Sequence, residues 1–162
     1  MRSTLLSILI VLMWFGGRTH EVVAPDRKIT ALIENFCPEG NIKESRITFV
    51  DASGRVLAQK SYVSKDSEHG YGIIHAQWTS DSQFFVYCMA SSGGHQAWHM
   101  PTWIYSAHGN RIFSIDEMFG PVASRSFQIL SGDSLQTTIL RGNINSIETV
   151  VIPLSGLIHR PK

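Results

Sequence analysis

The chain has few cysteines, few charges, and no long run of like charges or of apolar residues. Its 162 residues include two cysteines, and charged residues make up 17%. Lysine plus arginine number 14 and aspartate plus glutamate 13, without a cluster of either sign, so no nucleic acid is expected as a partner. No apolar run reaches the roughly 20 residues of a membrane-spanning helix. The apolar fraction of 43% is typical of one globular domain.

The sequence also lacks the motifs of several enzyme classes. It has neither a Walker-type phosphate loop nor a dinucleotide-binding glycine fingerprint, and no Gly-x-Ser-x-Gly turn to carry a catalytic serine. The pair His95 and His99 has Gln96 where zinc proteases carry their glutamate base, which excludes a zinc protease of that kind. No cofactor is expected.

The first residues have the layout of a secretory signal peptide. Arg2 precedes an apolar run of 11 residues, 5–15, which ends at Gly16. We assign residues 1–24 to the signal peptide, or to a membrane tether if it is not cleaved, and residues 25–162 to a single β domain. Export places the protein in the periplasm or outside the cell. In such an oxidising compartment Cys37 and Cys88 are candidates for a disulfide; alternatively Cys88 is a buried thiol and Cys37 a loop thiol.

Short runs rich in β-branched and aromatic residues, separated by glycine, serine and asparagine, predict an all-β fold. The predicted strands are 46–50, 55–62, 73–78, 84–89, 102–106, 111–115, 126–130, 135–140 and 148–154. One short helix is expected over 26–36, because its apolar residues Ile29, Leu32, Ile33 and Phe36 have helical spacing and Cys37-Pro38 would end it.

Two kinds of turn recur along the chain. An Asp-Ser turn at Asp81 returns 52 residues later at Asp133, and glycine turns at Gly54, Gly109 and Gly156 are 55 and 47 residues apart. Their alternation predicts antiparallel meander units of about 50 residues, each with four strands.

Residues 71–116 resemble one blade of the WD-like β-propeller repeats of bacterial envelope proteins. The resemblance rests on Trp78-Thr-Ser-Asp81-Ser82 and the strands that follow it, with serine where that family usually has proline and glycine. It implies a sheet architecture and an interaction surface, with no catalytic residue. Because a closed propeller takes about 4 to 8 blades, we expect two or three packed antiparallel meander sheets that resemble an incomplete propeller.

The connection from Ser91 to Pro101 is the candidate recognition site. This connection has 11 residues, whereas hairpin loops usually have about two to five. Aromatic and histidine side chains offer large contact area, and the predicted binding residues are His95, Trp98, His99 and Trp103. A structural alternative is that this loop covers an open sheet edge.

Three functions are open at this point. The leading hypothesis is an exported, non-enzymatic binding module for an unknown protein or envelope component. The second is a small metal-dependent or hydrolytic enzyme that uses His95 and His99. A non-catalytic metal site built from His95, His99 and a third ligand such as His75 or Asp81 is a separate alternative. The third is a structural subunit that forms homo-oligomers through open sheet edges.

Overall fold

Three antiparallel sheets make up the fold in the computed structural model, which describes residues 18–36, 44–66, 68–94, 96–131, 133–142 and 146–157. The predicted all-β fold of packed meander sheets is therefore confirmed. Within the described ranges, no helix has the length and apolar character needed to cross a membrane.

Two of the sheets have four strands and the third has three, each with its strands in chain order. Sheet A contains β1 (Arg18–Val23), β2 (Ile29–Phe36), β3 (Glu44–Asp51) and β4 (Val56–Ser61). Sheet B contains β5 (Tyr71–Trp78), β6 (Phe84–Ser91), β7 (Thr102–Ser106) and β8 (Arg111–Ser114). Sheet C contains β9 (Gln128–Leu130), β10 (Ser134–Leu140) and β11 (Ile147–Pro153). A helix, α1 (Ile115–Phe119), follows β8, and a short 3-10 helix, η1 (Ser155–Leu157), follows β11.

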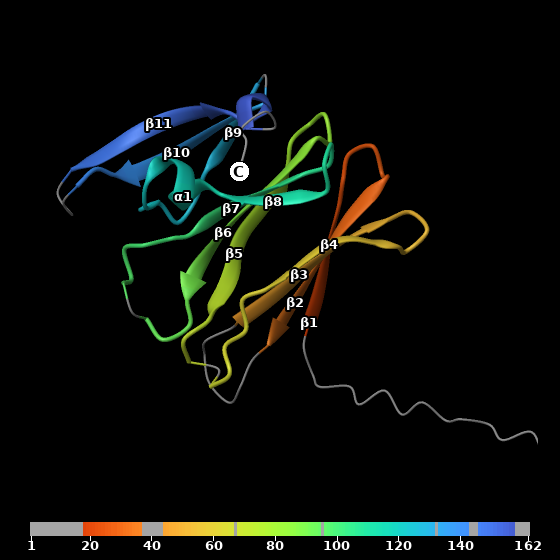
Figure 1. Cartoon of the computed structure of the whole chain (residues 1–162), viewed down its shortest axis with the longest axis horizontal. Helices are drawn as coiled ribbons and strands as arrows, with labels where there is room; N and C mark the ends of the chain where they lie inside the picture. Colours follow the sequence, from red (N-terminus) through yellow and green to blue (C-terminus); the bar gives the residue numbers. More distant parts are fainter. Residues whose placement is uncertain are drawn as a thin grey trace, which may run out of the picture.

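Sheet B is the middle layer (Figure 1). Every residue of β6 from Phe84 to Met89 is buried, and successive side chains point to opposite faces. One set packs against sheet A: Phe85, Tyr87 and Met89 join a cluster with Ile33, Ile47 and Phe49. The other packs against sheet C: Phe84, Val86 and Cys88 join a cluster with Leu135, Ile139 and Ile152. A strand covered on both faces needs a continuous apolar run, which β6 has.

Aromatic rings fill the interface between sheets A and B. The Phe49 ring stacks on Tyr105 with centroids 3.8 Å apart and meets Phe85 edge-on at 5.5 Å. Trp78 is buried beside them, and its indole N–H donates to the carbonyl oxygen of Val22 at 2.9 Å. Trp78 thus has a structural role that links β5 to β1.

Sheets A and B follow the same plan at an offset of 55 residues. In the β1–β2 turn, Ala24 N–H donates to the Ile29 carbonyl, and 55 residues later Thr79 N–H donates to Phe84 in the β5–β6 turn. Arg27 and Ser82, again 55 apart, both have positive φ, 59° and 65°. The glycine turns at 54 and 109 close the β3–β4 and β7–β8 hairpins, the last of each sheet, with the same offset.

The two Asp-Ser turns singled out in the sequence meet between sheets B and C. The carboxyl groups of Asp81 and Asp133 lie close enough to shift each other's pKa. Burial and the neighbouring Asp81 carboxylate raise the pKa of Asp133. Burial opposes ionisation of Asp81 as well, but hydrogen bonds from Thr79 and Gln83 outweigh it and lower the pKa of Asp81. This contact joins the two sheets at their turns.

The helix expected over residues 26–36 is wrong, because these residues form the end of a turn followed by β2. Ala31 and Ile33 point into the core and are buried, whereas Glu34 points to the outer face of the sheet and is half-exposed. Leu32 and Phe36 lie on the outer face of sheet A. Apolar residues on both faces of the strand produced the apparent helical spacing.

The domain boundary expected at residue 25 lies inside the folded domain. β1 pairs with β2 along its whole length, from Arg18 opposite Asn35 to Val23 opposite Thr30. Ala24 is buried in the core between sheets A and B. Residues 18–24 are therefore part of sheet A and its first turn, and residues 1–17 lie outside the described residues.

Candidate functional site

The end of the loop between β6 and β7 is fastened to the body of the protein. Pro101 accepts a hydrogen bond from Met89 N–H at 3.0 Å, and Met100 N–H donates to the Val122 carbonyl at 2.8 Å. Met100 is buried. His95, one of the four predicted binding residues, lies outside the described residues.

One carboxylate, that of Asp116 in α1, organises this end of the loop. Its Oδ1 lies 2.6 Å from His99 Nε2 and accepts the Val122 N–H at 3.1 Å. Its Oδ2 accepts the Thr102 N–H at 2.9 Å. Asp116 therefore connects the loop, the first residue of β7 and the segment after α1. Both side chains of the pair are largely buried, with 20% of His99 and 16% of Asp116 exposed.

Trp98 packs against the fixed imidazole. The ring centroids of Trp98 and His99 are 5.4 Å apart, with a tilt of 34° between the planes. The indole is partly exposed. The structure thus brings Trp98 and the anchored His99 together.

Trp103 belongs to a different part of the molecule. It follows Thr102 on β7, so its side chain points to the opposite face, toward sheet A. There the Lys60 Nζ lies 3.7 Å from the centroid of the Trp103 ring, and the Tyr62 ring lies at 5.9 Å. The indole nitrogen of Trp103 is buried without a hydrogen-bond partner. Within the described residues the predicted set is therefore divided: Trp98 and His99 lie in the loop beside α1, and Trp103 packs against sheet A.

Neither residue named as a third metal ligand packs with His99. The His75 ring packs on Phe127 at 4.5 Å, and Asp81 accepts the Thr79 hydroxyl at 2.6 Å in its own turn. In the part of the chain that the structure describes, no three His, Cys, Asp or Glu side chains are grouped to hold a metal ion.

Cys88 is a buried free thiol in this structure. Its Sγ donates to the Arg125 carbonyl at 3.4 Å, and burial raises the pKa of the thiol to about 12. Cys37 lies outside the described residues, so the Cys37–Cys88 disulfide stays a prediction.

Asp116 is the site residue that sequence reasoning missed. Ser114 and the two acids after it are a helix-start signal, and Ser114 Oγ does accept the Glu117 N–H at 3.3 Å. That signal explains α1 and says nothing of His99, which lies 17 residues earlier. No local pattern pairs the two.

No protein-family model, curated protein or solved structure matches this chain at a significant level. The geometry of the side chains therefore carries the functional argument.

Proposed function

We propose that this protein is an exported, non-enzymatic binding module whose interaction surface is the loop segment from Gln96 to His99. The observation that supports this proposal is the anchoring of His99 by Asp116, with the partly exposed Trp98 indole packed on the imidazole. The apolar run at residues 5–15 supports export.

A fixed tryptophan suits recognition for two physical reasons. Its side chain offers a large contact area, and tryptophan is enriched among residues that dominate binding energy. A side chain already held in one orientation loses little conformational entropy when a partner binds. The charge-assisted contact of His99 with Asp116 at 2.6 Å supplies that restraint.

The loop also indicates the kind of contact. Residues 91–101 contain no lysine, arginine, aspartate or glutamate. Binding through this surface should therefore depend on buried aromatic area more than on electrostatic attraction, and should change little with salt concentration. The partner is a protein or an envelope component with an apolar recess for the indole.

Site-specific photo-crosslinking in the native cells tests the proposal. A photoreactive amino acid replaces Ala97, which is exposed next to Trp98, in one variant and His108 in a control, so that Trp98 itself is kept. His108 is exposed in the turn between β7 and β8, at the other end of β7 from the loop. We expect one defined crosslinked species from position 97 and none from position 108. Equal crosslinking patterns from both positions would contradict the proposed surface.

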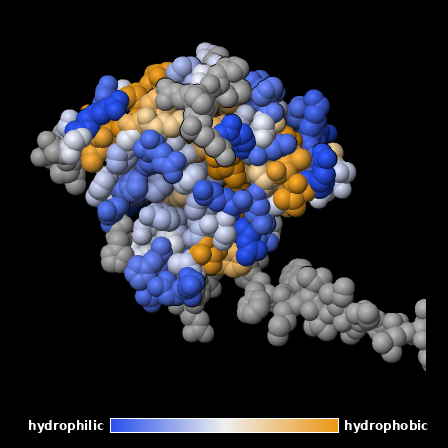
Figure 2. All heavy atoms as spheres, viewed as in Figure 1, coloured by the Kyte–Doolittle hydropathy of each residue, from blue (hydrophilic) through white to orange (hydrophobic). Residues whose placement is uncertain are grey.

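A second candidate function, self-association through sheet C, has its own observation. Two large apolar side chains on β11 are exposed, Ile147 at 59% and Val151 at 55%. In the described residues β11 pairs only with β10, and Figure 2 shows hydrophobic surface over this part of the molecule. An exposed apolar edge strand is a template for pairing with another copy.

Light scattering of the purified protein tests self-association. We expect a concentration-dependent dimer that Val151→Lys converts to a monomer, because a lysine on the edge opposes strand pairing. The matched change Val23→Lys, at a comparably exposed position on β1, should leave the dimer intact. A wild-type chain that stays monomeric at all concentrations removes this candidate.

A further inference from the structure

β1 is needed to close the core between sheets A and B. The carbonyl oxygen of Val22 accepts the N–H of the buried Trp78 indole at 2.9 Å. Ala24, directly after the strand, is 2% exposed and belongs to the core cluster between the two sheets. A chain without residues 18–24 would leave the Trp78 N–H without its acceptor, and a buried polar group without a partner is costly. The mature protein must therefore keep the body of β1.

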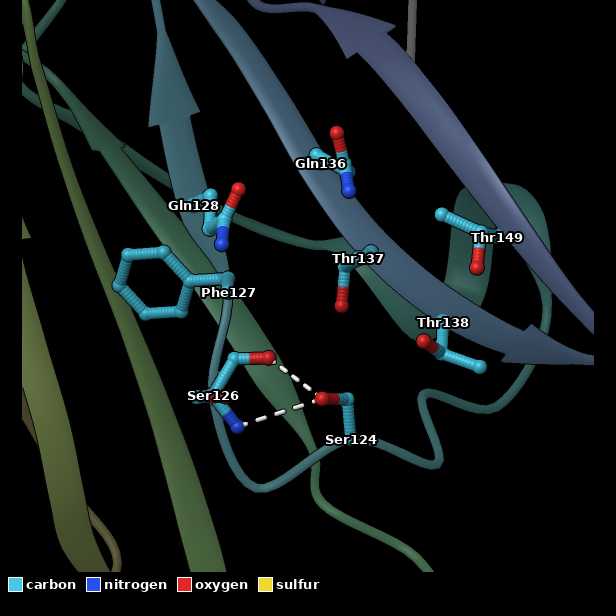
Figure 3. A pocket seen from close by; sticks show the side chains of 8 residues that line it. All are labelled: Ser124, Ser126, Phe127, Gln128, Gln136, Thr137, Thr138 and Thr149. Atoms are coloured by element: carbon cyan, nitrogen blue, oxygen red, sulfur yellow. Dashed lines mark hydrogen bonds between the residues drawn. The ribbon is translucent and has the colours of Figure 1, made fainter.

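Sheet C shows what a short first strand does to the strand beside it. β9, the first strand of sheet C, pairs with β10 at only three positions, and this pairing extends no further than Gln128. Beyond Gln128 a hollow of about 140 Å³ opens beside β10, where Ser124 and Ser126 line it (Figure 3). In sheet A, β1 covers six positions of β2. Loss of all six would leave an open strand edge, which is a template for unwanted pairing.

The start of β1 and its first turn offer two bonds with the pattern that a signal peptidase cuts. Such a peptidase takes small residues at the first and third positions before the bond. Within residues 16–25, Thr19 with Gly17 meets this pattern, and so does Ala24 with Val22. Every other bond in this range has a large or charged residue at one of the two positions. The sequence pattern therefore leaves two candidate bonds.

The fold distinguishes these two bonds. Cleavage after Ala24 would remove all of β1 together with a residue buried in the core. This bond also precedes Pro25, whose ring crowds the residue before it. Cleavage after Thr19 removes only Arg18 and Thr19, the first two of the six positions paired with β2. Residues 20–23 then stay in the sheet, and the contact of β1 with the Trp78 indole is kept.

We propose that a signal peptidase hydrolyses the Thr19–His20 bond, so that the mature protein begins at His20 with the body of β1 in place. One water molecule is consumed: Thr19 becomes the carboxylate end of the released leader, and His20 gains the free amino group. Because this bond lies in a paired strand of the folded protein, it is cut during export, before sheet A forms. The inference rests on the export proposed above and adds which bond is processed.

N-terminal sequencing and the intact mass of the exported protein test the site. The full chain, with a C-terminal affinity tag, is recovered from outside the cytoplasm of its native cells. We expect a protein that has lost residues 1–19 and begins at His20. Thr19→Leu and Gly17→Leu place a large side chain at the first or third position before the bond, so each should abolish this product. His20→Leu, the same kind of change just beyond the bond, is the matched control and should be processed as the wild type is.

The cellular fraction and the N-terminal residue are separate readouts, so export and the processing site fail separately. An exported protein that begins at Pro25, or one that keeps its leader, overturns the site and leaves export standing. The site is also overturned if Thr19→Leu and Gly17→Leu are still cut before His20. A protein found only in the cytoplasm with its leader attached overturns export, and the site with it.

Discussion

Glu44, the first residue of β3, is a fully buried carboxylate whose replacement should destabilise the protein strongly. It is 0% exposed and accepts four hydrogen bonds, each of 2.7 Å. The donors are the N–H and Oγ of Ser64, the N–H of Gly70 and the Oγ of Ser92. One side chain therefore holds the connection between β4 and β5 and the start of the loop after β6.

The change Glu44→Gln keeps the shape and removes part of this acceptor capacity. Oε1 accepts three of the four bonds, so the amide oxygen should take that position and the amide nitrogen should face the Ser64 N–H. That leaves one buried donor unpaired, at about 1–3 kcal/mol, and the remaining bonds lose their charge. We expect the free energy of unfolding to fall by about 2–3 kcal/mol at neutral pH.

The same carboxylate should make stability depend on acid. Burial raises the pKa of Glu44, but the hydrogen bonds from Ser64, Ser92 and Gly70 together outweigh it, and the pKa lies below the ordinary 4.5. A carboxyl group with a lowered folded-state pKa contributes stability above its unfolded-state pKa and loses it as the pH falls through the folded-state pKa. The wild type should therefore lose more stability than Glu44→Gln as the pH falls below about 4.5.

Urea unfolding at neutral and at acid pH measures both effects. Glu21→Gln, an exposed glutamate on the edge strand β1, is the matched control and should stay within about 0.5 kcal/mol of the wild type. Hydrogen exchange should locate the effect at the amides of Ser64 and Gly70. A Glu44→Gln variant within about 0.5 kcal/mol of the wild type at neutral pH, or with the same acid profile, would refute the reasoning.

Two further predictions concern the core layers. Phe49→Ala removes the ring that contacts both Tyr105 and Phe85, and should lower the free energy of unfolding by about 3–5 kcal/mol in thermal or urea unfolding; the half-buried Phe113, changed in the same way, should cost clearly less. The Cys88 thiol should resist alkylation at pH 8 in the native protein and react after unfolding, because burial raises its pKa to about 12. Rapid native labelling would contradict its burial, and a requirement for prior reduction would establish the disulfide with Cys37.

The strands of sheet B and the β3–β4 hairpin of sheet A were predictable, because the residues within their turns favour the turn conformation. Asp51 Oδ1 accepts the N–H groups of Ser53 and Arg55, and Gly54 takes the positive φ of 82° that the turn needs. Short apolar strands between such turns leave few alternatives to antiparallel pairing.

The first hairpin of sheet A was not predictable in the same way. In β2 the outward residues Leu32 and Phe36 are as apolar as the inward ones, so the period of two is hidden. The Pro25-Asp26 turn also differs in sequence from Ser80-Asp81, although the two turns share their hydrogen bonds at an offset of 55 residues. Tertiary pairing with β1 and β3 decides the structure there.

The candidate site could be predicted only in part. The loop and its tryptophan stand out in the sequence, because the loop is long and carries several ring side chains. The contact that fixes His99 depends on how sheet B brings α1 beside the loop, and Trp103 points from β7 toward sheet A, away from the contact of His99 with Asp116. The donors to Glu44 likewise come from residues 20 to 48 positions away.

The central claim, that an anchored Trp98 binds a partner, is tested most directly by crosslinking from position 97, beside an intact Trp98, with and without Asp116→Asn. This change keeps the shape of residue 116 and weakens its hold on His99. The account predicts that the crosslinked species from position 97 decreases severalfold in the Asp116→Asn background while circular dichroism shows a folded protein. An unchanged yield would contradict it, because the loop would then bind without its anchor.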